Sequence, residues 1–398
     1  MILIYCARTF FVQNRISCID KDDMIYLDNA ATSRFKPKCV LDALIFDVTH
    51  SANSGRAGHD EAIDKSIRIQ KCREYLLSVF GASDEYSLIF TKNCTEALNL
   101  AIFGIVKGGE RVLTGVNEHN SVLRPLFKLK QEGKISLEIV KTNPLGRIDV
   151  KDVEKFATNA DILVFGGACN VNGAICDIQS IADYCKNNGK ILILDGAQSV
   201  PLIPLTLKSS GISMLACPGH KGLHGVQGTG FLVVRKDIKL SPLLYGGTGT
   251  FSSDVTPIVE MPDSFEAGTL FSGGIDALRQ GAKWSFDNVD KNRKYIDRIT
   301  KNILHGLHDI GATLYTRDTQ TGVVCFNLAN ADSGYIADKL NEYGICVRGG
   351  LHCAPLVHRE QGTSFQGAVR ASVGCETKEG EIAYFLSVVE RLMKGLKS

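Results

Sequence analysis

The sequence predicts an α/β protein with a large, mostly parallel sheet, followed by a smaller α+β domain. Between about residues 85 and 235, short apolar, β-branched runs alternate with amphipathic stretches such as TEALNLAIFGIVK (95–107) and DIQSIADYCKNN (177–188). Strands separated by helices are typical of a parallel sheet that is covered on both faces. The predicted strands are SLIFT (87–91), RVLTG (111–115), SLEIVKT (136–142), DILVFGG (161–167), KILILDG (190–196), ISMLAC (212–217) and GFLVVR (230–235).

Helical and loop-rich segments flank this unit. A helix is predicted before it, over 58–80, and a segment rich in Gly, Ser, Thr and Pro follows it at 240–275. A long helical pattern at about 276–308 then leads to GVVCFNL, GICVRGG and AVRASVG, which alternate with helices at 333–343 and about 377–396. Strands and helices in this order predict the smaller α+β domain.

The composition excludes several classes of partner. A net charge of +2 gives no electrostatic basis for binding nucleic acid, and no apolar run reaches the length of a transmembrane helix. The 13 cysteines form no C-x-x-C pair, which indicates a reducing compartment, and we expect a cytoplasmic protein. Cys72, Cys185 and Cys325 lie inside apolar patterns and are predicted to be core residues.

Two chemically distinctive residues end neighbouring predicted strands. The apolar run ILILD ends in Asp195, and Lys221 lies in a Gly-rich loop after the next strand. Asp195 alone has a simpler reading, as a cap of the next turn. Together, however, the two suit pyridoxal 5'-phosphate (PLP), because a lysine amine attaches this cofactor and a carboxylate keeps its pyridine nitrogen protonated.

The motifs around these residues resemble those of a known family. D-G-A-Q at 195–198, followed by G-H-K at 219–221, is similar to the class V aminotransferases and, within them, to the cysteine desulfurases. The resemblance runs from Tyr26 to the final helix. It implies fold type I of the PLP enzymes and a homodimer with shared active sites.

The resemblance also implies a division of the chain. Residues 24–37 form an N-terminal segment associated with the small domain, 38–275 form the large PLP-binding domain, and 276–398 form the small domain that carries the catalytic cysteine loop. Residues 1–23 are expected to be a dispensable extension or a misassigned start rather than a targeting peptide, because no small-residue cleavage site follows their apolar start.

The cofactor phosphate requires a helix N-terminus, and FTKNCTEALNL (90–100) supplies one. Asn93 and Glu96 have the spacing of a capping box at its start. In the family, the residues at Cys94 and Thr95 hold the phosphate.

Further cofactor contacts follow from the resemblance alone. His220 matches another phosphate ligand, and His119 matches an imidazole that stacks on the pyridine ring and shuttles protons. Asn170 and Gln198 match residues that bond the phenolic oxygen. Thr269, in the E-A-G-T segment, matches a threonine that reaches the phosphate of the neighbouring subunit.

The loop RGGLHCAPLVH (348–358) distinguishes the chain from a general aminotransferase. Arg348 and His352 are expected to favour the thiolate of Cys353, as a sulfur nucleophile requires. R-x-G-x-H-C-A resembles the second group of cysteine desulfurases and the selenocysteine lyases, in which the matching cysteine becomes a persulfide. Arg370, in AVRASVG, matches the arginine that binds the substrate carboxylate; an internal salt bridge is the structural alternative.

Three positions depart from the family pattern, and one apparent metal motif is rejected. Pro218 replaces a phosphate-binding serine, Phe271 replaces an asparagine, and Gly55 stands where a histidine often lies near the substrate. No metal site is expected, because His220 and His224 are four residues apart but lack the glutamate of a zincin.

The predicted activity is that of a PLP-dependent cysteine desulfurase. Lys221, Cys353 and His119 are the predicted catalytic residues, and Arg370, Arg348 and Asn170 are expected to bind the substrate. L-cysteine is converted to L-alanine, and Cys353 passes the sulfur to an acceptor protein or thiol, as in iron–sulfur cluster assembly.

Three alternatives remain open. One is a selenocysteine lyase that uses the same residues on a selenium substrate. Another is a class V aminotransferase or C–S lyase in which Cys353 is incidental. The third is a non-catalytic scaffold that partners a carrier protein, against which the joint presence of Asp195, Lys221, Cys353 and Arg370 argues.

Overall fold

The computed structural model describes residues 24–54, 58–82, 84–248, 255–256 and 259–397. The expectations for residues 1–23 and for Gly55 lie outside this part of the chain.

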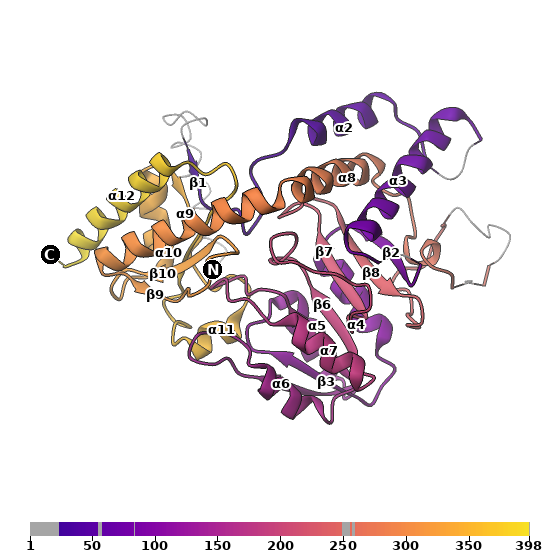
Figure 1. The fold of residues 1–398 in the computed structure, drawn as a ribbon, viewed down its shortest axis with the longest axis horizontal. Coiled ribbons are helices and arrows are strands. Elements are labelled where there is room, and N and C mark those ends of the chain that lie inside the picture. Colours follow the sequence, from indigo (N-terminus) through magenta and orange to yellow (C-terminus); the bar gives the residue numbers. More distant parts are fainter. Residues whose placement is uncertain (1–23, 55–57, 83, 249–254, 257–258, 398) are drawn as a thin grey trace, which may run out of the picture.

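The largest element is a seven-stranded sheet with the order β2-β8-β7-β6-β5-β3-β4 (Figure 1). β8 runs antiparallel to both of its neighbours, and the other neighbouring pairs are parallel. This confirms the predicted α/β architecture with a mostly parallel sheet. Its strands are β2 (Tyr86–Thr91), β3 (Glu110–Gly115), β4 (Ile135–Val140), β5 (Ile162–Gly166), β6 (Ile191–Asp195), β7 (Met214–Pro218) and β8 (Gly230–Arg235).

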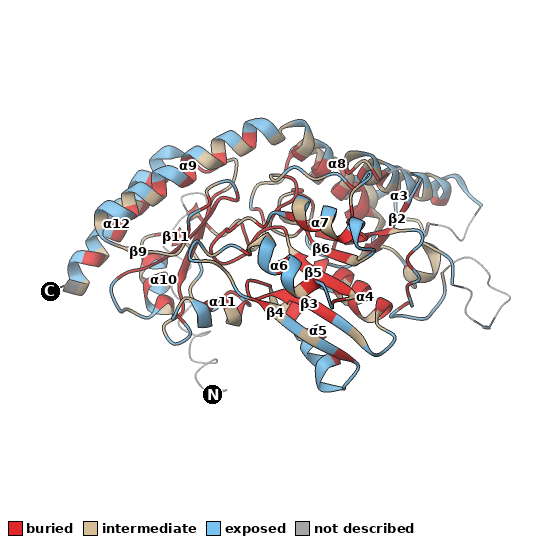
Figure 2. Cartoon of the chain, turned by 60° about the horizontal axis from the view of Figure 1, so that its bottom comes forward, coloured by how far each residue is buried: buried red, intermediate tan, exposed pale blue. Residues whose placement is uncertain are grey.

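Helices cover both faces of this sheet, so nearly all residues of its central strands are buried (Figure 2). In β2, Leu88 and Phe90 point into one core cluster, whereas Ile89 points into the cluster on the opposite face. This explains why the strands appear in the sequence as continuous apolar runs rather than as alternating ones. The helices of this unit are α2 (Lys38–Thr49), α3 (Asp60–Val79), α4 (Cys94–Ile105), α5 (Asn120–Gln131), α6 (Val150–Ala157), α7 (Ile178–Asn187) and α8 (Ser272–Asp287).

A second core lies in the C-terminal unit. It contains the antiparallel sheet β12-β10-β9 and the parallel pair β1-β11. Ile25 and Leu27 of the N-terminal segment pack in this core, so both ends of the chain build the unit. Its elements are β1 (Ile25–Tyr26), α9 (Val289–Ile310), β9 (Thr313–Leu314), β10 (Val323–Asn327), α10 (Ser333–Glu342), β11 (Ile345–Cys346), α11 (Pro355–Glu360), β12 (Val369–Ser372) and α12 (Glu379–Lys397).

The single helix predicted at 276–308 is two helices in the structure. Asn288 lies between α8 and α9, and its side-chain amide donates to the carbonyl of Trp284 at 2.8 Å. Asn competes for backbone hydrogen bonds in this way and favours helix ends. Ile275 and Leu278 of α8 pack against the large sheet, whereas Ile299 of α9 packs in the C-terminal core. The chain therefore passes from the core of the large sheet to the C-terminal core at Asn288, and not at the predicted boundary near residue 276.

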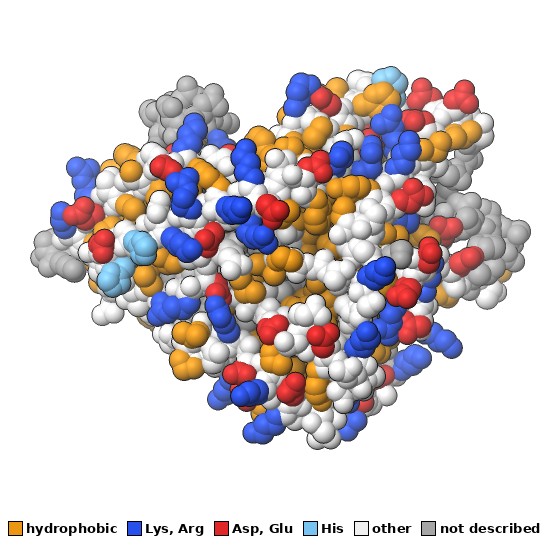
Figure 3. Space-filling model, viewed as in Figure 1, with side chains coloured by type: hydrophobic (Ala, Val, Ile, Leu, Met, Phe, Trp, Pro, Cys, Tyr) orange, Lys and Arg blue, Asp and Glu red, His pale blue; other side chains and the backbone are white. Residues whose placement is uncertain are grey.

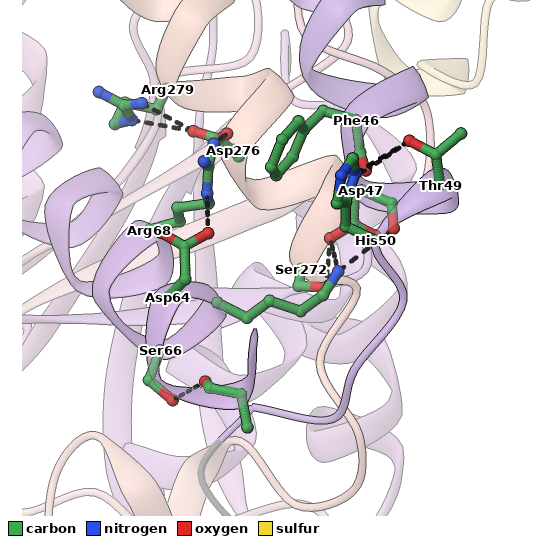
Figure 4. A network of polar contacts seen from close by, with 12 residues as sticks. Phe46, Asp47, Thr49, His50, Asp64, Ser66, Arg68, Ser272, Asp276 and Arg279 are labelled. Carbon is green, nitrogen blue, oxygen red and sulfur yellow. Dashed lines mark hydrogen bonds and ion pairs between the residues drawn. The ribbon is translucent and has the colours of Figure 1, made fainter. Parts of the chain in front are cut away.

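A polar network joins α2, α3 and α8 (Figure 4). The buried Lys65 amine of α3 forms an ion pair with Asp47 of α2, which also accepts a hydrogen bond from Ser272 Oγ at 2.9 Å. Arg68 of α3 binds Asp276 of α8 at 3.0 Å. Because a buried ammonium without its partner is costly, this network fixes the start of α8 against the sheet-covering helices.

No helix in the described part of the chain combines the length and the apolar character that crossing a membrane requires.

Candidate active site

The carboxyl ends of the parallel strands border an open cavity of about 590 Å³. Residues far apart in the sequence meet there because β2, β3, β5, β6 and β7 all point toward this edge of the sheet. The cavity lining includes Cys94, Thr95, His119, Asn170, Asp195, Gln198, His220 and Lys221. The structure thus brings together every residue that the sequence analysis predicted to bind the cofactor, except Thr269. Thr269 is exposed in the segment before α8.

Asp195, the last residue of β6, is buried at the base of the cavity. Its Oδ1 accepts a hydrogen bond from the backbone N–H of Ala197 at 2.8 Å and a longer one from the Cys94 thiol at 3.5 Å. Burial and the charge of Asp195 raise the pKa of Cys94 well above its ordinary value, so this thiol stays protonated as a donor. The Cys94 side chain therefore contacts the carboxylate, although its backbone lies at the start of α4.

Lys221 follows β7 in the loop that faces Asp195. Burial lowers the pKa of its amine below 10.5, and the charge of Asp195 opposes this effect. A lysine with a lowered pKa has a larger neutral fraction at a given pH, and only the neutral amine attacks a carbonyl carbon. The loop thus holds an amine that is suited to attach an aldehyde cofactor.

The N-terminus of α4 forms one end of the cavity. Asn93 caps the helix by accepting the Glu96 N–H at 2.9 Å, and Glu96 in turn accepts the N–H of Lys92 rather than that of Asn93. Thr95 Oγ1 lies 2.8 Å from Ser121 Oγ. His220 Nδ1 is buried, and no described atom is its hydrogen-bond partner. A helix N-terminus beside an unsatisfied imidazole nitrogen is a suitable site for a phosphate group.

His119 is the N-cap of α5, and its ring lines the same cavity. Its Nδ1 accepts the backbone N–H of Ser121 at 3.0 Å, so the proton of the neutral ring lies on Nε2. Burial is the main cause that lowers the pKa of His119. The structure therefore fixes the tautomer and orientation of a neutral imidazole at the cavity.

Cys353 lies in an exposed loop that touches the cavity residues through the backbone. Its carbonyl accepts the N–H of Asn120 at 2.7 Å, and the carbonyl of His352 accepts the side-chain amide of Asn170 at 2.6 Å. His352 and Cys353 have positive φ angles of 49° and 58°, a left-handed conformation that is uncommon for residues other than glycine. The hydrogen bonds from Asn120 and Asn170 therefore hold the backbone of this strained loop, and the loop exposes the Cys353 thiol.

His352 does not favour the Cys353 thiolate in the way that the sequence suggested. Its ring is buried, its Nε2 lies 2.9 Å from the Ala368 carbonyl, and burial lowers its pKa to about 3. The ring is therefore neutral near pH 7 and supplies no positive charge to the thiol.

Arg370 is buried, and Asp28 is its anionic partner. Arg370 Nη2 binds Asp28 Oδ1 at 2.8 Å, and Nη1 donates to the Asn170 carbonyl at 2.9 Å. Arg348 binds the other oxygen of Asp28. The internal salt bridge that was the alternative reading of Arg370 thus exists, but it leaves Arg370 Nε buried with no partner among the described atoms. Asp28 was missed, although an acid after the apolar pair Tyr26-Leu27 was a visible signal.

Comparisons with known proteins agree with this geometry. The aminotransferase class-V family model matches residues 25–385. The chain belongs to the class-V aminotransferase family, in the branch of the cysteine desulfurases.

Relatives from archaea match nearly the whole chain. A probable cysteine desulfurase of Pyrococcus abyssi is 32% identical over 94% of this chain and 96% of its own length. Another, from Methanothermobacter thermautotrophicus, is 31% identical over 93% of this chain and 95% of its own. The solved apo structure of a cysteine desulfurase from Thermococcus onnurineus NA1 has a TM-score of 0.88 and 30% identity, covering 94% and 96% of the two chains.

The residues present fit the PLP that such family members carry. The cavity offers an amine on Lys221, a carboxylate on Asp195, an oriented imidazole on His119 and a helix N-terminus at α4. The unsatisfied His220 Nδ1 and Asn170 Oδ1 are buried polar atoms that a ligand would complete. Native structures rarely leave such atoms unpaired, so these two atoms support a polar ligand at this position.

Glu118 is a buried acid that sequence reasoning also missed. It follows β3 and accepts the Gly166 N–H at 3.0 Å, and its burial raises its pKa to about 8. The folded protein therefore binds this proton more tightly than the unfolded chain. The stability that results is fully present below the ordinary pKa of 4.5 and is lost as the pH rises through about 8.

We expect Glu118→Gln to become more stable than the natural protein as the pH rises from about 4.5 to about 8, because the amide keeps the neutral shape and cannot ionise. The difference in unfolding free energy should reach a few kcal/mol at the upper end. Thermal unfolding at several pH values measures it. Glu154→Gln, on the exposed face of α6, is the control. A difference for Glu118→Gln that does not change with pH would contradict the assignment.

Proposed function

We propose that the protein is a PLP-dependent cysteine desulfurase that converts L-cysteine to L-alanine and takes the sulfur onto Cys353 as a persulfide. One observation carries the proposal: Asn170 lines the cavity of Lys221 and Asp195 and also contacts both the Cys353 loop and Arg370. A cofactor site, a substrate-carboxylate site and a thiol loop thus share one residue.

When bound, PLP supplies an electron sink for bonds at the substrate Cα and Cβ. In our proposal Lys221 attaches the cofactor and then moves the Cα proton, while Asp195 holds a proton on the pyridine nitrogen. The residues that would hold the cofactor are His119 at its ring, Gln198 and Asn170 near its phenolic oxygen, and the α4 N-terminus with Thr95 and His220 at its phosphate.

Arg370 binds the substrate carboxylate in this proposal, and the Cys353 thiolate attacks the substrate sulfur. A sulfur–sulfur bond forms as the carbon–sulfur bond breaks, and the electron pair of the broken bond stays on the substrate carbon. That carbon takes up a proton, Lys221 returns a proton to Cα, and alanine leaves. The products are one alanine and one Cys353 persulfide, whose outer sulfur passes to an acceptor protein or thiol.

We also propose that the protein acts as a homodimer in which Thr269 reaches the phosphate of the partner's site. Exposed hydrophobic side chains support a self-association surface, and some of them emerge over α2 and α3 on the face that Figure 3 shows. The exposed hydrophobic residues of α2 and α3 include Leu41, Ile45, Val48, Ile63 and Ile67, and those outside these helices include Leu244, Tyr245 and Phe271.

A substrate panel on the purified, PLP-loaded protein tests the proposed activity. Cysteine, selenocysteine and cysteine sulfinate are supplied with a thiol reductant and cystine without one, and alanine is measured together with sulfide, selenide or sulfite. We expect equimolar alanine and sulfide from cysteine. Turnover of selenocysteine alone would indicate a selenocysteine lyase, and no turnover of any of them would contradict the proposal.

A further inference from the structure

Asp28 connects Arg348 and Arg370, the two arginines that we expect to bind the substrate. Its Oδ1 accepts Arg370 Nη2 at 2.8 Å, and its Oδ2 accepts Arg348 Nη2 at 3.0 Å and Nε at 3.2 Å. One carboxylate thus bridges a guanidinium that is 3% exposed and one that is 47% exposed.

The backbone holds these three residues in register. Arg348 and Arg370 form an antiparallel bridge, with N–H to carbonyl distances of 3.1 and 2.7 Å in the two directions. Asp28 forms a parallel bridge with Ser372, which lies two residues beyond Arg370 in β12 and so on the same face of the strand. The sheet therefore fixes the backbone from which the Asp28 carboxylate reaches both arginines.

The charges of this group are unequal. Two guanidinium groups face one carboxylate, which leaves one positive charge. Arg370 Nε is buried and has no partner among the described atoms, so an N–H group remains for a ligand beside the bonds that Asp28 already takes. A single carboxylate would satisfy both the remaining charge and the remaining N–H.

We infer that Asp28 determines specificity: it orients Arg370 and cancels the charge of Arg348, so that the site selects α-amino acids with one carboxylate over those with a second anionic group. This inference rests on the proposed function, because Arg370 is taken as the ligand of the substrate carboxylate. Asp28 acts through the arginines and is a positioning residue.

The test compares butyrate and succinate, which have four carbons each and differ by one carboxylate. Neither has an amine, so both report on anion binding without reacting with the cofactor. Affinities for the PLP-loaded enzyme are measured by calorimetry and, separately, as inhibition constants against L-cysteine. For Asp28→Asn, we expect affinity for succinate relative to butyrate to rise about tenfold, the size expected for one more unit charge several ångströms from the ligand.

Asp161→Asn is the matched control. Asp161 also holds an arginine guanidinium through two contacts, from Arg111 Nε at 3.3 Å and Nη2 at 3.1 Å, but it lies at the amino ends of the strands, opposite the cavity. In Asp161→Asn, the affinity for succinate relative to butyrate should stay unchanged. In Asp28→Asn/Arg348→Gln, removal of the extra positive charge should return the ratio to that of the natural protein.

Three results would overturn the inference: an unchanged ratio in folded Asp28→Asn, an equal change in Asp161→Asn, or no return in the double variant. If Asp28→Asn does not fold, Arg348→Gln decides. It removes the net charge, so succinate binding should weaken more than butyrate binding, and an equal effect on both would contradict the inference. The calorimetric ratios are obtained whether or not cysteine turns over, so failure of the proposed function and failure of this inference are distinguishable.

Discussion

Replacement of Lys221 by alanine is expected to abolish turnover of L-cysteine, with a loss of at least about a thousandfold. In the structure, this amine lies in the same cavity as Asp195 and His119, and burial lowers its pKa. Alanine removes the amine that we propose both as the attachment point of the cofactor and as the carrier of the Cα proton. Binding of the phosphate at α4 does not depend on the amine, so PLP should still bind, but without a covalent link.

One measurement and one control variant test the assignment of Lys221. Borohydride reduction followed by peptide mass spectrometry should place the cofactor on Lys221 in the natural protein and on no lysine in the variant. Lys283→Ala, an exposed lysine of α8 that pairs with Asp287, should keep both the adduct and the activity. An adduct on a different lysine of the natural protein would disprove the assignment.

Replacement of Cys353 by serine is expected to lower sulfide and persulfide formation by at least about a thousandfold, because a hydroxyl is a far weaker nucleophile than a thiolate near neutral pH. Cys353 is exposed and lies outside the cavity lining, whereas the residues that line the cavity are unchanged in the variant. The absorbance of the bound cofactor and the exchange of the substrate Cα proton with solvent should therefore persist.

Cys39→Ser provides the matched control for a thiol. Cys39 is half-buried in α2, and its Sγ lies 3.9 Å from the Gln280 carbonyl, away from the proposed chemistry. This variant should keep normal sulfur transfer. Sulfide production that continues in Cys353→Ser would favour a C–S lyase in which the thiol is incidental, and a persulfide found on another cysteine would relocate the acceptor.

Much of the fold and part of the cavity could be predicted from local patterns. Apolar runs identified the strands of the large sheet, and Asp195 and Lys221 were expected to lie together because they follow neighbouring strands. His119 was placed with them only by the family resemblance. The division into two helices at Asn288 was missed because the helical pattern of the sequence continues through this residue. The structure separates the helices because α8 packs against the large sheet and α9 packs in the C-terminal core.

By itself, the sequence determined the α/β class, the strand runs and a set of residues that share one sheet edge, because each depends on hydrophobic period and chain order over short distances. Only the tertiary structure decided which partner each polar group meets. It brought the Cys94 thiol into contact with the Asp195 carboxylate and paired Asp28 with Arg348 and Arg370. It also buried His352, which lowers the pKa of that ring and keeps it neutral. These outcomes depend on burial and on contacts between segments hundreds of residues apart, and no local pattern encodes either.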